Sequence, residues 1–118
     1  MAVITPVWRR TPLDCSRFVL LEWAGLGTGD TAEPVVIGGV SDKSVQVTGT
    51  ITALDIVGSI DPDPATAVFH VLNDSRGEGN PLSFTAADLR TILEHTYLLK
   101  PSGITGSGIT VRVLGVMP

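Results

Sequence analysis

Apolar and polar residues alternate along much of the chain, which is typical of β-strands with one buried face. The clearest cases are SVQVTGTI (44–51) and ITVRVLGV (109–116). Further runs rich in strand-forming residues predict additional strands at 17–24, 34–40, 52–60, 66–72 and 97–101.

Clusters of Gly, Pro, Asn and Asp separate these runs and predict the turns and loops. They are LGTGDTAEP (26–34), DPDPA (61–65), NDSRGEGNP (73–81) and SGITGSG (102–108). Short strands with such punctuation indicate one mainly β domain over residues 17–118. We expect a β-sandwich or partly closed barrel, jelly-roll or immunoglobulin-like, with one short helix and an extended N-terminal arm.

The segment TAADLRTILEH (85–95) carries the pattern of that helix. Thr85 would cap it, with Asp88 three residues later returning the hydrogen bond, and Phe84 would pack on Leu89. An amphipathic helix would bury its apolar face against the β domain. The residues on that face are Leu89, Ile92 and Leu93.

Residues 1–16 contain two prolines and no sustained period, so they predict an extended arm. The arm either folds back on its own domain or lies on a neighbouring subunit. We take it as a candidate assembly element, because aromatic and arginine side chains often dominate interface energetics. The candidate partner-binding residues are Val3, Ile4, Val7, Trp8, Arg9 and Arg10.

Composition favours a protein that works by contact with other proteins. Apolar residues make up 43% and charged residues 17% of 118 residues, so part of the surface is expected to be covered by a partner. Residues 1–17 hold three arginines against one aspartate, whereas the rest holds five basic against eleven acidic residues. A basic arm before an acidic body could favour contact with a neighbouring copy.

The same composition argues against several other classes. Scattered basic residues on an acidic body give no track for nucleic-acid phosphates. No apolar run is long enough to span a bilayer, and no export signal is evident, so a soluble protein is expected. The single Cys15 allows no internal disulfide, as expected in a reducing cytoplasm.

No catalytic site, metal site or cofactor is predicted. His70 and His95 have no ligand at metal-binding spacing, and His95 would complement the negative end of the helix dipole. Cys15 lies in the arm without a catalytic signature, and Asp61 and Asp63 fit a solvated loop. GLGTG (25–29) is a turn rather than a phosphate loop. A pair of acidic catalysts brought together by the fold stays open.

Three segments, SVQVTGT (44–50), NPLSFTAADL (80–89) and YLLKPSGITGSGITVRVLG (97–115), carry a family resemblance. In this order they resemble the small β-rich proteins encoded among the head and tail genes of tailed bacteriophages. The resemblance spans about residues 43–115, and residues 51–65 depart from it.

The resemblance implies a non-enzymatic virion protein assembled in the host bacterial cytoplasm. It favours a capsid decoration (cement) protein that stabilises the phage head from outside, with a tail or connector component as the alternative. The implied partners are the major capsid protein or another virion protein, and further copies of the chain, with a trimer favoured.

A ligand- or carbohydrate-binding β-sandwich is the alternative from another class, and a small enzyme is a third. Carbohydrate binding would need exposed aromatic residues on one face or at one loop end. The chain has six aromatics, most at core-like positions: Trp8, Phe18, Trp23, Phe69, Phe84 and Tyr97.

Overall fold

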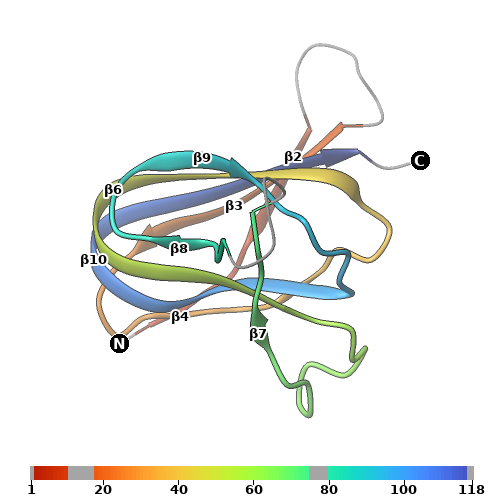
Figure 1. The fold of residues 1–118 in the computed structure, drawn as a ribbon. Helices are drawn as coiled ribbons and strands as arrows, with labels where there is room; N and C mark the ends of the chain where they lie inside the picture. The colour runs from red at the N-terminus through yellow and green to blue at the C-terminus, as the bar shows by residue number, and fades with distance from the viewer. Residues whose placement is uncertain (1, 11–17, 75–79, 117–118) are drawn as a thin grey trace.

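The computed structural model describes residues 2–10, 18–74 and 80–116 (Figure 1). All regular secondary structure in these ranges is β-strand, which confirms the prediction of a mainly β protein. The strands are β1 (Val3–Ile4), β2 (Val7–Arg10), β3 (Phe18–Leu26), β4 (Thr31–Ala32), β5 (Val35–Val36), β6 (Ser41–Ser59), β7 (His70–Val71), β8 (Ser83–Phe84), β9 (Asp88–Thr91) and β10 (Leu98–Val116).

Two long antiparallel strands, β6 and β10, organise the fold. They pair along nearly their whole length, from Ser41 opposite Val116 to Ser59 opposite Leu98. Both strands curve back midway, so each contributes to two layers (Figure 1). From the sequence, two separate strands were predicted in place of β6 and two in place of β10, with a turn at 102–108. That turn is wrong, because this stretch is a bend inside β10.

Glycines allow the bend. Gly49, Gly103, Gly106 and Gly108 have positive φ, and the β6–β10 register shifts at several points between Ser102 and Thr110. A Cβ atom on Gly106 would overlap the carbonyl oxygen of Thr50 on the facing strand. The residues that predict a turn are therefore needed here for curvature and close backbone approach.

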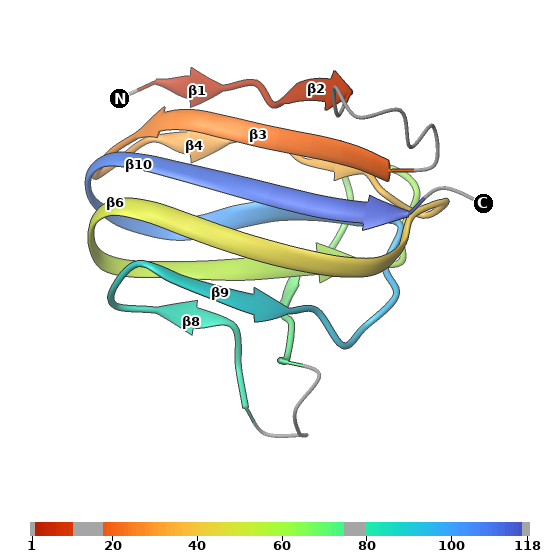
Figure 2. The same cartoon turned by 90° about the horizontal axis from the view of Figure 1, so that it is seen from above.

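The first layer has the strand order β2-β3-β10-β6-β9 and uses the end of β10 and the start of β6 (Figure 2). The second layer contains the other halves of β6 and β10, flanked by β5, β7 and β8. The sheets are open, so the alternative of a partly closed barrel is wrong. The β-sandwich and its jelly-roll or immunoglobulin-like topology stay predictions.

The core consists of inward side chains from both long strands and from β3. Trp23 is completely buried, and its Nε1 donates to the carbonyl oxygen of Glu33 across 2.9 Å. This bond satisfies the one polar atom of a large apolar side chain, so the indole can be buried without an unpaired donor. Other buried members of this cluster are Leu21, Val45, Val47, Leu54, Ile56, Leu99, Val111 and Val113.

The predicted helix at 85–95 is wrong. Residues 88–91 form β9, which pairs with residues 44–47 of β6. The Asp88 carboxylate accepts from the amide of Leu89 across 2.8 Å, and Thr85 lies in a bend. Pairing with β6 satisfies backbone groups that would otherwise form an open sheet edge, and this outweighs a weak local preference for helix.

The described part of the arm pairs within the chain. β1 runs parallel to β4, and β2 runs antiparallel to β3. Of the two arrangements considered for the arm, residues 2–10 adopt the one that folds back on its own domain. Residues 11–17, including Cys15, lie outside the described residues. In the part of the chain that the structure describes, no helix could cross a membrane.

Candidate protein-binding surface

The outward side of the first layer presents side chains in rows across its five strands. One row runs from Val7 through Glu22, Arg112 and Gln46 to Leu89. Such directly opposed residues lie on the same face of a sheet. Figure 2 looks onto this face. We call it the outer face and define it by the residues that line it: Leu20, Glu22, Ser44, Gln46, Leu89, Arg112 and Leu114.

Three leucines give the outer face its apolar character. They line a shallow depression of about 730 Å³, together with the four polar residues. Leu89 is 61% exposed on β9, and Leu114 is 38% exposed on β10. Val7 and Phe18 are exposed on the neighbouring parts of β2 and β3. Outward positions of a solvated sheet are normally polar, so a group of apolar residues indicates a contact surface.

A charged pair lies among these leucines. Arg112 Nε donates to Glu22 Oε2 across 2.6 Å, and the side chains of Arg112 and Glu22 are 47% and 9% exposed. Among the described residues, Nε is the only side-chain nitrogen of Arg112 that has an acceptor. Its two terminal nitrogens are therefore available to an incoming polar group, and such charge-assisted bonds are strong and directional.

A second depression, the end groove, lies beside the loop that follows β6. It has a volume of about 710 Å³ and is lined by Ile60, Val68, His70, Val71, His95 and Thr96, among others. Ile60 is 81% exposed, which makes it the most exposed large apolar residue in the described ranges. The end groove is lined by the second layer and its loops, away from the outer face.

The polar groups of the end groove do not form a metal site. No group of three or more His, Cys, Asp or Glu residues that could hold an ion occurs in the described ranges. His95 Nε2 lies 2.8 Å from the carbonyl oxygen of Gly38. The predicted role of His95 at a helix end is therefore wrong, because the ring bonds to a turn and no helix precedes it.

The loop carboxylates and the glycine segment serve local turns. Asp61 accepts from the amide of Asp63, and Asp63 accepts from the amide of Ala65, each across 3.0 Å. Residues 28–29 lie in a turn, as the sequence predicted for GLGTG. These groups stabilise loops by bonding to nearby backbone amides.

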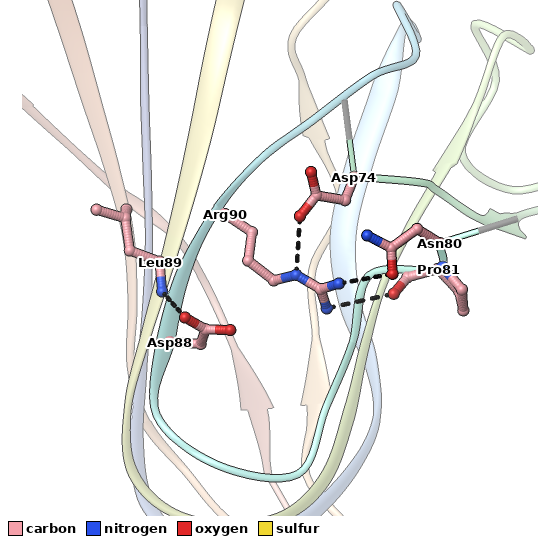
Figure 3. Close-up of polar contacts among 6 residues, drawn as sticks. All are labelled: Asp74, Asn80, Pro81, Asp88, Leu89 and Arg90. Atoms are coloured by element: carbon pink, nitrogen blue, oxygen red, sulfur yellow. Dashed lines mark hydrogen bonds and ion pairs between the residues drawn. The ribbon is translucent and has the colours of Figure 1, made fainter. Parts of the chain in front are cut away.

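A buried ion pair fixes the segment that carries β9 (Figure 3). Arg90 Nε donates to Asp74 Oδ2 across 3.0 Å, while its terminal nitrogens donate to Asn80 Oδ1 and to the carbonyl oxygen of Pro81. The guanidinium also lies 5.6 Å from the centre of the Phe84 ring. These contacts lie on the inner side of β9 and hold the strand that displays Leu89 outward.

The candidate residues in the arm are only partly brought to this surface. Val3, Val7 and Trp8 are exposed, and Ile4 packs against the core. Val7 shares a row with the outer face, whereas Trp8 lies opposite the buried Leu21 on the other side of the sheet. The side chains of Arg9 and Arg10 lie outside the described part.

Sequence reasoning missed the outer face. Its leucines lie at the outward positions of their strands, where polar residues are expected. Leu114 follows the inward Val113, and Leu20 precedes the inward Leu21. In a strand with one buried face, apolar residues in the polar phase are the signal that could have pointed to a contact surface.

Comparisons with known proteins place the fold. No protein-family model matches the sequence, and no curated protein matches it. Among solved structures, the crystal structure of the SPBc2 prophage-derived protein YomS is similar, with a TM-score of 0.57 and 12% sequence identity. The similarity covers 88% of this chain and 98% of YomS. At this identity the two chains share a fold.

Proposed function

We propose that this chain is a non-enzymatic structural protein of a tailed bacteriophage particle that acts by binding other proteins through its outer face. The observation that carries the proposal is the group of three outward leucines around Arg112, whose terminal nitrogens have no acceptor among the described residues. Apolar residues around a directional charged group are typical of protein interfaces.

Two further observations support a phage origin. The fold is similar to that of a prophage-derived protein, and residues 43–115 carry the family resemblance described above. Within the particle we propose a decoration protein on the outside of the capsid. Decoration multiplies one weak contact over many copies, which suits a small domain with a shallow contact surface.

The aromatic residues do not favour the carbohydrate-binding alternative. Trp23 and Phe84 are buried, and Lys100 Nζ lies 4.4 Å from the centre of the Phe69 ring. The exposed aromatics lie apart, with Trp8 on the inward side of β2, Phe18 on the outward side of β3 and Tyr97 beside Gly38. None of the described aromatics lines the outer face. A sugar-binding site commonly needs exposed aromatic rings gathered on one face, and the outer face has none among its lining residues, so protein binding is the better account of this surface.

The test is to locate the chain in particles of the phage that encodes it. Mass spectrometry of purified particles should detect it in many copies, and electron microscopy should place it on the outer capsid surface. If electron microscopy instead places the chain on the tail, the protein is a tail or connector component and not a capsid decoration protein. Absence of the chain from complete particles would overturn the proposal.

A further inference from the structure

We infer that the outer face binds the outer face of a second copy of this chain, related by a two-fold axis. The inference rests on the proposed function, because it takes the outer face as a surface that binds protein. It adds the identity of the partner, which is a second copy of the chain. In a two-fold interface the same patch occurs on both sides, so the patch must complement itself. The outer face meets this requirement in its shape, its polar groups and its charge.

The shape of the face allows two sheets to pack against each other. The residues that define the face come from four adjacent strands, and its leucines lie on both outer strands, at Leu20 and Leu89, and on an inner strand, at Leu114. Sheets that pack face to face are about 10 Å apart and interdigitate such side chains. A two-fold copy would cover the exposed leucines of each molecule with those of the other.

The polar groups of the face complement each other as well. Arg112 has terminal donors without acceptors among the described residues, and the same face carries acceptor oxygens on Gln46 and Ser44. These lie on β6, next to the strand of Arg112, so a two-fold rotation brings donors of one copy toward acceptors of the other. An unrelated partner would have to supply acceptors at matching positions among apolar groups.

The charge of the outer face, compared with that of the whole chain, favours contact between two copies through this face. The whole chain carries a formal charge of −4, so two copies repel each other on average. Among the described residues that line it, the outer face has one arginine and one glutamate, so their charges cancel. Approach through this face therefore avoids the like-charge repulsion that acidic surfaces would produce.

The size of the face sets the strength of the contact. The four strands of the outer face, at about 4.8 Å spacing, give it a width of roughly 15–20 Å. The four-residue strand β9 is roughly 13 Å long, so the patch covers roughly 200–260 Å². This is well below the roughly 800 Å² per partner of a standard stable interface. We therefore expect a weak dimer that depends on protein concentration and is reinforced when many copies are held on one particle.

Sedimentation velocity of the full chain over a concentration series, up to about 1 mM, tests the inference. The wild type should shift from monomer to dimer within the series. Leu114→Asp and Leu89→Asp should each weaken association at least tenfold, because each buries a charge against apolar groups. Arg112→Lys keeps the positive charge but loses the planar pair of terminal donors, and it should weaken the dimer too.

Ile60→Asp is the matched control, since Ile60 is an exposed apolar residue in the end groove, away from the outer face. It should dimerise like the wild type, and melting temperatures should show that all variants are folded. Leu89 is the more exposed of the two leucines, so Leu89→Asp remains informative if Leu114→Asp fails to fold.

A monomer at every concentration would overturn the inference, as would outer-face variants that associate like the wild type or a trimer that survives them. These outcomes are separate from those of the proposed function. A chain found in particles but monomeric in solution refutes only the dimer, and a dimer absent from particles refutes only the virion role.

Discussion

The guanidinium Nε of Arg90 donates to Oδ2 of Asp74 across 3.0 Å, and the Asp74 side chain is completely buried. In the sequence, Asp74 directly precedes residues 75–79 and Arg90 follows them. Their pair fixes the strand β9 to the segment that follows β7, in the region where the sequence favoured a helix.

Removal of Arg90 should therefore be costly. Arg90→Leu breaks the ion pair with the buried Asp74 carboxylate, and breaking a buried pair costs about 3–5 kcal/mol. We expect urea denaturation to report a loss of this size. The double variant with Asp74→Asn should lose less than the sum of the two single variants, because the charge and its partner are removed together. Additive losses would contradict a coupled pair.

The bend in β10 depends on Gly106, which has a φ of 144° and faces the backbone of Thr50. Gly106→Ala should destabilise the protein by about 1–3 kcal/mol from backbone strain, with a further loss from the overlap. Gly39→Ala is the control, since no atom lies within 4 Å of a Cβ placed there. Thermal unfolding should separate the two variants, and equal stability would mean that the strand bends elsewhere.

The strand at 88–91 reverses the expected role of Leu89, which the predicted helix would have buried. Leu89 is exposed, whereas Phe84 is 3% exposed in the core. Phe84→Ala should cost about 3–5 kcal/mol, and Leu89→Ala should be close to neutral in the monomer. Thr85→Ala should also be close to neutral, because Thr85 caps no helix. A large loss for Leu89→Ala in dilute protein would restore the helical prediction.

Lys43 links stability to pH. Burial lowers the pKa of Lys43 from 10.5, with Asp42 acting in the opposite direction, and its Nζ donates to the carbonyl oxygen of Val40 across 3.2 Å. Between the folded-state pKa and 10.5 the unfolded chain binds more protons, so stability rises with pH in that window. The contribution of Lys43 is full above 10.5 and is lost as pH falls through the folded-state pKa.

The variant Lys43→Met isolates this contribution, because it removes the charge and retains an unbranched apolar chain. Between about pH 7 and pH 10, the stability of the wild type relative to the variant should increase. Urea midpoints at the two pH values measure the difference. A constant difference would show that Lys43 titrates alike in both states.

Removal of the arm should destabilise the domain itself. Deletion of residues 2–10 removes β1 and β2, and with them the backbone pairing to β4 and β3. The exposed edge of β3 would lose its hydrogen bonds, and the melting temperature should fall by about 10 °C or more. An arm that only contacted a neighbouring subunit would leave the melting temperature of the isolated domain unchanged. The double substitution Val3→Ser and Trp8→Ser, which retains the backbone pairing, should have a smaller effect.

Period-2 alternation alone determined the strand character of this chain. The inward residues of 44–51 and 109–116 are those that the core buries, because a strand with one buried face has to repeat every second residue. The loop at 61–65 was likewise predictable, since its prolines cannot donate to a sheet.

Only the tertiary structure decided how these strands continue and which residues they display. Glycines at 102–108 predict a turn when read locally, but pairing with β6 through that stretch makes them a bend in one strand. Residues 85–95 fit a helix by spacing, but the edge of β6 offered backbone partners that a helix would leave unused. The outer face exists because Leu20, Leu89 and Leu114 come from three strands that only the folded sheet brings together. Local sequence cannot encode that proximity, because long-range pairing sets it.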